Sequence, residues 1–250
     1  MVQIKNNEQL ACMRKAGRIT GEAILAAREH IKEGVSTKEL DTIIRNYIEK
    51  CGAKPSFLGY GGFPGSACIS INNEVIHGIP NAKRFLQEGD IVKIDVGAYI
   101  GGYHGDSANT FGVGKISEEA EKLIAVTRES FFRGVKMAAK GKRVGDIGSE
   151  ICGYAEGLGY GVVRKFVGHG IGRELHEDPE VPNFGTAGRG VRLYPGMTVA
   201  IEPMINIGTR DVKILDDGWT VITADGSLSA HYEHSVAITD GEPILLTYVE

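Results

Sequence analysis

The chain has 250 residues, of which 42% are hydrophobic and 24% are charged, and its formal net charge is -4. These values are ordinary for a globular protein with a large core, and the mild acidity gives no reason to expect nucleic acid or a membrane surface as a partner. No apolar run has the length of a signal peptide or a membrane span, so we expect a cytoplasmic protein. The four scattered cysteines form no C-x-x-C motif and are expected to be reduced, mostly buried thiols.

Two helices are predicted at the start of the chain. Residues 7–32 repeat apolar side chains at near-helical spacing, and Gly34 follows the predicted end. A second helix is predicted to begin with Ser36 or Thr37 as its cap and with Glu39 in the first turn. Strands are then expected at residues 67–71, 91–99 and 103–113.

The same order of elements then begins again. Helices are expected at residues 117–139 and 144–158, and strands follow at residues 161–168, 197–203, 219–223 and 231–239. The order of two helices and then strands therefore occurs twice, which is consistent with a duplicated α+β unit around one sheet. Because no Pro- or Ser-rich linker separates the halves, we expect a single catalytic domain over residues 1–250.

An aspartate stands in the middle of an apolar predicted strand. In IVKIDVGAY, residues 91–99, alternation places three apolar side chains on one face and Lys93, Asp95 and Gly97 on the other. Asp95 therefore need not interrupt the core, because it lies on the opposite face of a half-buried strand.

A tight turn is predicted to bring a second aspartate to the same face. Residues 101–102 are both glycine and suit a two-residue hairpin turn, since both positions can take a positive φ. In this register Asp95 faces Ala108 on the neighbouring strand. Asp106 faces Gly97, so the two aspartates become diagonal neighbours roughly 7–8 Å apart. The small residues opposite them leave room for an ion, although two solvated surface acids would explain the pair alone equally well.

Three further predicted strands each carry a candidate metal ligand. Glu202 lies in the apolar run MTVAIEP, Glu233 lies in AHYEHSVAIT, and His169 ends VVRKFVGHG between two glycines. Together with Asp95 and Asp106 they make a donor set that suits divalent Mn, Fe, Co or Zn better than a metal bound by thiolates. Two divalent ions would balance four carboxylates that otherwise repel one another, and such a pair is a known device for activating a bridging water.

Several segments together resemble the type I methionine aminopeptidases of bacteria in order and spacing. These segments are NEVIHGIP, KIDVGAYIGGYHGDSANTF, GHGIGRELHEDPEVPNFG, AIEPMI and DGWTVITADGSLSAHYEHSV. The resemblance spans nearly the whole chain. It implies the pita-bread fold, an α/β (α+β) arrangement in which a pseudo-two-fold pair of helix-helix-strand units surrounds a curved, mainly antiparallel sheet.

The same resemblance implies an activity and a setting for it. The activity is the removal of the initiator methionine from nascent proteins when the second residue is small. The cofactors would be two divalent metal ions (Co, Mn, Fe or Zn), and the partner would be the N-terminus of a peptide or nascent chain near the ribosome. The enzyme is expected to be a cytoplasmic monomer that binds neither nucleic acid nor membrane.

Roles for the five candidate ligands also follow from the resemblance. Asp95 would hold one ion, and His169 and Glu202 would hold the other. Asp106 and Glu233 would bridge both ions. Glu202 would in addition shuttle the proton as general acid and base.

Two further histidines are implied to act on the substrate. His77 in VIHGIP would help to place it, and His176 in GRELHED would donate to the scissile carbonyl or to the intermediate. Either one, seen alone, would be interpreted as a hydrogen-bonded structural histidine. We expect His104, His231 and His234 to support the site or to lie on the surface.

A pocket for a methionine side chain needs apolar and aromatic walls, because a thioether gains from contact with aromatic rings. The stretch PSFLGYGGFPGSACIS and the only tryptophan of the chain supply candidates, with ordinary core packing as the alternative explanation. The resemblance places around this pocket the residues Phe57, Tyr60, Phe63, Cys68 and Trp219. Phe57 and Leu175 stand where other members of the family often differ, and Gly61 stands where many relatives are expected to have a histidine.

Two alternatives share the fold. A proline-directed peptidase would use the same five ligands, but such enzymes usually carry a separate N-terminal domain, whereas this chain begins close to the catalytic unit. A metal-free binding module would be expected to have lost ligands, and all five are present. The sequence contains no G-x-S-x-G, H-E-x-x-H or Walker A motif, and Cys68 is more simply interpreted as a buried thiol than as a nucleophile.

Overall fold

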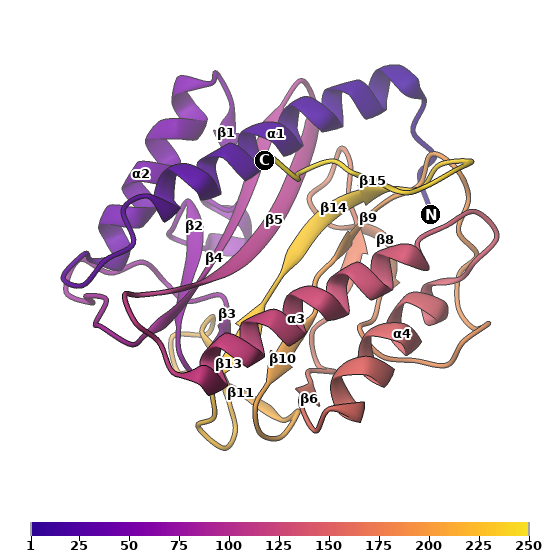
Figure 1. Ribbon diagram of the computed structural model, residues 1–250. Helices are drawn as coiled ribbons and strands as arrows, with labels where there is room; N and C mark the ends of the chain where they lie inside the picture. The colour runs from indigo at the N-terminus through magenta and orange to yellow at the C-terminus, as the bar shows by residue number, and fades with distance from the viewer. Residues whose placement is uncertain (1, 250) are drawn as a thin grey trace.

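Nine strands form the central sheet of the computed structural model, which describes residues 2–249 (Figure 1). Their order is β1-β4-β5-β14-β9-β7-β8, with β2 beside β4 and β15 beside β14, and every pair is antiparallel. The strands are β1 (Lys54–Pro55), β2 (Ala67–Ile71), β4 (Ile91–Ile100), β5 (Tyr103–Gly112), β7 (Gly168–Gly170), β8 (Glu177–Val181), β9 (Thr198–Ile201), β14 (Glu233–Ala237) and β15 (Ile244–Leu245). Because β5 pairs with β14, the two halves of the chain meet in one sheet, as predicted.

Two smaller antiparallel sheets, in the orders β13-β10-β6 and β11-β12-β3, flank the central one. Their strands are β3 (Glu74–Ile76), β6 (Gly161–Val162), β10 (Met204–Asn206), β11 (Val212–Ile214), β12 (Val221–Thr223) and β13 (Ser229–His231). Figure 1 shows these strands toward the end of the molecule away from the chain termini.

Two pairs of helices pack against the central sheet (Figure 1). They are α1 (Asn7–Arg28) and α2 (Thr37–Lys50), which contact β4, β5 and β2, and α3 (Glu118–Lys136) and α4 (Val144–Gly157), which contact β9 and β8. A buried apolar cluster lies between each helix pair and the sheet. Within the described part of the chain, no helix combines the length and the apolar character that a membrane crossing requires.

The beginnings of α1 and α2 are determined by capping boxes. The Asn6 side chain accepts a hydrogen bond from the backbone N–H of Gln9, and the Gln9 side chain accepts one from the backbone N–H of Asn6. Ser36 and Glu39 make the same reciprocal pair at α2. Each box satisfies backbone donors that the first helical turn cannot satisfy, which confirms the predicted start at Ser36.

The first helix ends earlier than its sequence pattern predicts. α1 ends at Arg28 rather than at residue 32. Beyond it the chain turns, and Ile31 and Val35 pack against the apolar cluster between the N-terminal helices and the sheet. The apolar side chains beyond Arg28 therefore reach the core from a turn and not from a continued helix.

Three predicted strands are divided because the chain passes from one sheet to another. The runs 197–203 and 231–239 each split in two, so that β9 pairs with β14 in the central sheet whereas β10 pairs with β13 in a small one. The exchange occurs where the backbone N–H of Tyr232 donates to the carbonyl of Pro203. The run 161–168 splits likewise, since β6 joins β10 and β7 joins β9. Strand composition alone does not reveal such an exchange.

The hairpin of β4 and β5 has the predicted register. Gly101 and Gly102 take φ values of 63° and 85°, and Asp95 is paired with Ala108. The prediction of a half-buried strand is wrong, because β4 is buried on both faces from residue 91 to residue 98. Asp95 is only 9% exposed. The two candidate aspartates are therefore not solvated surface acids.

A lysine is buried on the same face of β4. Lys93 is 1% exposed, and its ammonium group donates to the carbonyls of Asn72 at 2.7 Å and Ser229 at 3.0 Å. Burial lowers the pKa of Lys93 to about 7. The side chain thus joins the turn between β2 and β3 to β13 through two backbone carbonyls.

We expect Lys93→Met to destabilise the fold, because the carbonyls of Asn72 and Ser229 each lose the hydrogen bond from the ammonium group. The expected loss is about 2–4 kcal/mol in the free energy of unfolding, a fall of roughly 4–16 °C in Tm. Thermal unfolding measures this change, with Lys122→Met on the exposed face of α3 as the matched control. Equal Tm values for the two variants would contradict the structural role of Lys93.

Candidate active site

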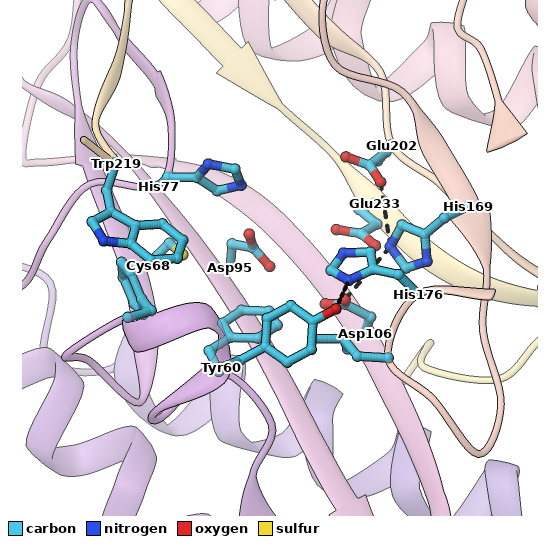
Figure 2. Close-up of a pocket in the computed structure, with 13 residues that line it drawn as sticks. Tyr60, Cys68, His77, Asp95, Asp106, His169, His176, Glu202, Trp219 and Glu233 are labelled. Atoms are coloured by element: carbon cyan, nitrogen blue, oxygen red, sulfur yellow. Dashed lines mark hydrogen bonds and ion pairs between the residues drawn. The ribbon is translucent and has the colours of Figure 1, made fainter. Parts of the chain in front are cut away.

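Five neighbouring strands bring one acidic or imidazole side chain each to a single cavity (Figure 2). These side chains are Asp95 on β4, Asp106 on β5, Glu233 on β14, Glu202 after the end of β9 and His169 on β7. The register explains their convergence, because Asp95 and Glu233 both pair with Ala108, one from each side of β5. Continuing the β14–β9 register by one residue places Glu202 opposite Glu233.

The distances within this group separate a close cluster from Asp95. Ligand atoms of Asp106, His169 and Glu233 all lie within 4.8 Å of one another. Nε2 of His169 lies 3.6 Å from a carboxylate oxygen of Glu202 and 3.9 Å from one of Asp106. Asp95 lies outside this close cluster, on the side of the apolar walls (Figure 2). The structure therefore brings together all five residues that the sequence nominated as ligands.

Several oxygens of this cluster are buried without a hydrogen-bond partner among the described residues. They are Oδ1 of Asp95, Oδ1 of Asp106 and Oε1 of Glu233. Leaving such groups unsatisfied costs free energy, and clustered negative charge adds to that cost. Divalent cations would remove both penalties, so the residues present fit a metal centre of hard oxygen ligands and one imidazole.

The protonation states of the cluster follow from its burial. Burial raises the pKa of Asp106 to about 7, and it raises the pKa values of Asp95, Glu202 and Glu233 well above their usual range, with the charge of Asp106 adding to the rise in each. Without cations, some of these carboxyl groups hold a proton at neutral pH. Metal binding must therefore displace protons.

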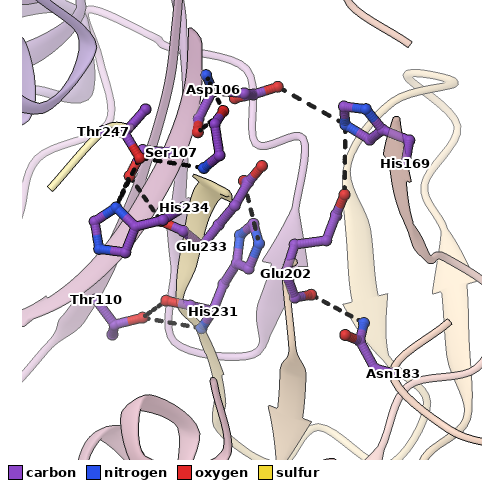
Figure 3. Close-up of polar contacts among 11 residues, drawn as sticks. Asp106, Ser107, Thr110, His169, Asn183, Glu202, His231, Glu233, His234 and Thr247 are labelled. Atoms are coloured by element: carbon purple, nitrogen blue, oxygen red, sulfur yellow. Dashed lines mark hydrogen bonds and ion pairs between the residues drawn. The ribbon is translucent and has the colours of Figure 1, made fainter. Parts of the chain in front are cut away.

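His169 is prepared to act as a ligand. Its Nδ1–H donates to the carbonyl of Gly170 at 2.8 Å, and burial lowers its pKa to about 3. The ring is therefore neutral, and its bare Nε2 faces Asp106 and Glu202 (Figure 3). A hydrogen bond that fixes the tautomer in this way is typical of metal-binding histidines.

The other end of the cavity is apolar. The cavity has a volume of about 150 Å³, and all five predicted pocket residues line it, together with Leu175. The rings of Phe63 and Trp219 meet edge to face at 5.1 Å. Phe57 and Cys68 are buried, whereas Tyr60 is 46% exposed and lies at the mouth. Cys68 has its pKa raised by burial, which favours a neutral thiol in the wall over a nucleophile.

Gly97 was expected to leave room for an ion, but the structure shows a different reason for a glycine at this position. A Cβ at Gly97 would lie 2.7 Å from Cβ of Ser56 and 2.8 Å from Cε1 of Phe57. The space above this glycine therefore admits the chain that carries Phe57 and provides no room for an ion.

Gly61 has a φ of +56°, and a Cβ there would approach Trp219 to 3.3 Å. A histidine at this position would need a strained backbone and a displaced ring.

His77 and His176 both line the cavity. His77 holds a positive φ of 60°, which is uncommon for a residue with a Cβ, and its ring meets Phe166 and Trp219 edge to face. Burial lowers its pKa to about 4, so the ring is neutral. His176 lies at the mouth, with its ring centroid 4.3 Å from that of His169. Neither histidine belongs to the close cluster of donor atoms.

The three remaining histidines near the site do not lie on the surface. His231 and His234 are buried, and His104 is half-buried and bonded to Ser56. Nε2 of His231 lies 3.7 Å from a carboxylate oxygen of Glu233 (Figure 3). His234 points to the other side of β14, where its Nδ1 lies 2.8 Å from the hydroxyl of Thr247. These positions therefore favour the expectation that the three histidines support the site over the alternative that they lie on the surface.

Hydroxyl and amide side chains that the sequence analysis missed hold the backbone of the ligands (Figure 3). Ser107 donates to the carbonyl of Glu233 at 2.6 Å, and Asn183 donates to the carbonyl of Glu202 at 3.0 Å. Ser235 bonds both the N–H and the carbonyl of Asp106. Ser107 and Ser235 stand one and two residues from a ligand, and this short spacing is the only signal that the sequence offers.

The sequence matches Metallopeptidase family M24 over residues 11–240. The chain belongs to this family. It is 56% identical over 250 residues to the methionine aminopeptidase of Clostridium perfringens and 50% identical over 249 residues to methionine aminopeptidase 1 of Bacillus subtilis, with full coverage of both chains in each case. The predicted resemblance to the bacterial enzymes is thus confirmed.

Solved structures give the same result. The crystal structure of methionine aminopeptidase from Thermotoga maritima matches with a TM-score of 0.98 and 43% identity over 100% of both chains. Prolidase from Pyrococcus furiosus matches with a TM-score of 0.80 and 26% identity, over 99% of this chain and 66% of that one. The predicted fold class is therefore confirmed, and the M24 match makes this chain a metallopeptidase.

Proposed function

We propose that this chain is a metal-dependent aminopeptidase that releases the N-terminal initiator methionine from nascent proteins whose second residue is small. One observation carries the proposal: the carboxylates that surround His169 and the apolar aromatic pocket line the same cavity, with Asp95 between them (Figure 2). A methionine side chain seated against Phe63 and Trp219 would therefore place its own amine and carbonyl at the carboxylates. The full-length relatives named methionine aminopeptidase support this assignment.

Two divalent ions, of Co, Mn, Fe or Zn, are proposed as cofactors. Asp95 would hold one ion, His169 and Glu202 the other, and Asp106 and Glu233 would bridge them. When bound, the ions would polarise the scissile carbonyl and lower the pKa of a water molecule.

The side chains of the cavity would perform the remaining steps. Phe57, Phe63 and Trp219 exclude water around the thioether and orient the substrate. Glu202 takes the proton of the attacking water as the carbon–oxygen bond forms, and returns it to the nitrogen as the carbon–nitrogen bond breaks. His176 donates to the carbonyl oxygen on which negative charge develops, and His77 contacts the substrate backbone.

The proposal extends to the setting of the enzyme. We place it in the cytoplasm as a monomeric single domain acting close to the ribosome, where new N-termini emerge. Its partner is the polypeptide substrate, and the net charge of -4 offers nothing that would favour nucleic acid.

Peptide hydrolysis tests the proposal. Metal-stripped protein titrated with Co or Mn is expected to release methionine from Met-Ala-Ser, but not from Met-Leu-Ser, and to leave Ala-Pro-Ala intact. Cleavage of Ala-Pro-Ala alone would favour the proline-directed alternative, whose solved relative is 26% identical to this chain. A folded protein that cleaves none of these peptides at any metal concentration would favour a non-catalytic binding module.

A further inference from the structure

A tyrosine and a histidine are paired at the mouth of the cavity (Figure 2). The hydroxyl of Tyr60 lies 2.7 Å from Nδ1 of His176, and the two ring centroids are 5.2 Å apart. Tyr60 is 46% exposed, so its hydroxyl is not forced to bond with protein. The close approach therefore reflects a specific partner, and it leaves the second ring nitrogen of His176 turned toward the cavity (Figure 2).

The backbone of a short turn sets the position of Tyr60. This turn, η1 (Tyr60–Gly62), is bounded by Gly59 with a φ of 82° and contains Gly61 and Gly62 with φ values of 56° and 91°. Within it, the N–H of Tyr60 donates to the carbonyl of Phe57 and the N–H of Gly62 donates to that of Gly59. Three left-handed residues within four positions would be strained for most side chains, so the glycines of this sequence specifically permit the geometry that aims Tyr60 at His176.

The pairing has a consequence for the tautomer of His176. A neutral imidazole has one N–H donor and one bare nitrogen, whereas a tyrosine hydroxyl can donate its proton. If the Tyr60 O–H donates to Nδ1, the imidazole proton must be on Nε2, which faces the cavity. In the opposite tautomer, Nε2 would present a lone pair and would have nothing to donate to a carbonyl oxygen.

The neighbouring histidine provides an internal comparison. His169, whose ring centroid is 4.3 Å away, bonds the carbonyl of Gly170 through Nδ1. A carbonyl can only accept, so His169 is protonated on Nδ1 and bare on Nε2. The Tyr60 hydroxyl, unlike a carbonyl, is able to donate to Nδ1 of His176, and His176 then has the reverse arrangement. In that case the two adjacent imidazoles differ in role, one suited to bind a cation and the other to donate a hydrogen bond, because their Nδ1 partners differ.

We propose that Tyr60 is a positioning residue, whose hydroxyl donates to Nδ1 of His176 and keeps the Nε2–H of that ring directed at the scissile carbonyl. This inference deepens the proposed function and rests on it for the identity of the carbonyl. The hydrogen bond and the tautomer are properties of the folded chain, and they can be tested without any turnover.

Long-range ¹⁵N–¹H spectra distinguish protonated from bare ring nitrogens and test the tautomer directly. The protein is labelled at histidine and studied both metal-free and loaded with diamagnetic zinc, with His176→Gln used to assign the resonances. We expect Nε2–H in the wild-type protein and a mixture of tautomers in Tyr60→Phe. Tyr99→Phe is the matched control, because Tyr99 packs on His104 rather than His176. A proton on Nδ1 in the wild type, or an unchanged tautomer in Tyr60→Phe, would overturn the proposal.

Kinetics test whether the tautomer matters for the reaction. Tyr60→Phe is expected to lower kcat for Met-Ala-Ser by about 10-fold with little change in KM, whereas Tyr99→Phe should leave both unchanged. In a His176→Gln background the same substitution should have no further effect, because Tyr60 acts through that ring. Independent, multiplicative losses, or a change confined to KM, would instead make Tyr60 a direct contact of the substrate. Absence of any Met-Ala-Ser cleavage by the wild type would refute the proposed function, and the spectra would still decide the hydrogen bond.

Discussion

Asp106→Asn is expected to abolish methionine release and, in metal-free protein, to raise the thermal stability. The activity loss should be about three orders of magnitude or more, because Asp106 contributes to the closest group of donor atoms in the cavity. The gain in stability has a separate cause. Asp106 is 4% exposed with a pKa of about 7, so at pH 8 the folded metal-free protein holds a buried carboxylate that an amide replaces without charge. The expected gain is about 1–3 kcal/mol, or roughly 2–10 °C in Tm.

Two measurements separate these effects. Calorimetry or circular dichroism at pH 8 gives Tm with chelator and with excess Mn, and peptide assays give the rate. Added metal should stabilise the wild type but hardly affect the variant. Asp216→Asn, at an exposed position, is the matched control and should behave as the wild type. Activity of Asp106→Asn within about 10-fold of the wild type would remove Asp106 from the metal centre.

Local sequence signals predicted much of the fold because they act over a few residues. The Ser36 cap determines where α2 begins, and the glycines at 101–102 determine the register that makes Asp95 and Asp106 neighbours. Both signals operate within one element or one hairpin. The order of elements was likewise predicted from local signals, because the spacing of apolar residues indicates two helices and then strands, twice along the chain.

The features that the sequence did not reveal depend on segments distant along the chain. The burial of Lys93 requires carbonyls of Asn72 and Ser229 to meet its ammonium group, the second of them 136 residues away. The division of the strands at Pro203 and Tyr232 depends on which sheet each half joins. Neither contact has a periodicity that a sequence could display.

In the candidate site, too, some residues could be predicted from the sequence and others could not. The five proposed ligands followed from acids in apolar runs together with the resemblance to known enzymes. The residues that hold them, such as Ser107 and Asn183, carry no comparable signal because serine and asparagine are common on any surface. The pairing of Tyr60 with His176 spans 116 residues and depends on the turn that aims the tyrosine.

Metal-free protein is expected to lose stability as the pH rises from 7 to 8.5, and bound metal should cancel this loss. The carboxylates have folded pKa values raised by burial above their unfolded values of about 4. Their contribution is fully present below the unfolded pKa and is lost as the pH rises through the folded pKa, about 7 for Asp106. His169 and His231 have the opposite dependence, since their pKa values are lowered to about 3. Their stability is present above an unfolded pKa of about 6.5, so these histidines add no slope above pH 7. Lys93, whose pKa burial lowers to about 7, adds stability as the pH rises, but the four carboxylates outweigh this one lysine and set the slope.

Tm measured across this range, with chelator and with Mn, tests the prediction. At a metal concentration 100 times Kd, binding adds about 2.7 kcal/mol, which corresponds to roughly 5–11 °C, and the difference between the two curves should widen with pH. Because binding displaces protons from the carboxyl groups, titration calorimetry in buffers of different ionisation enthalpy should show proton release that decreases as the pH rises. Glu233→Gln removes one of these groups and should reduce both the slope and the release. Parallel Tm curves, or binding without proton release at pH 7, would mean that the carboxylates are already ionised in the metal-free protein and that their burial is compensated by another group.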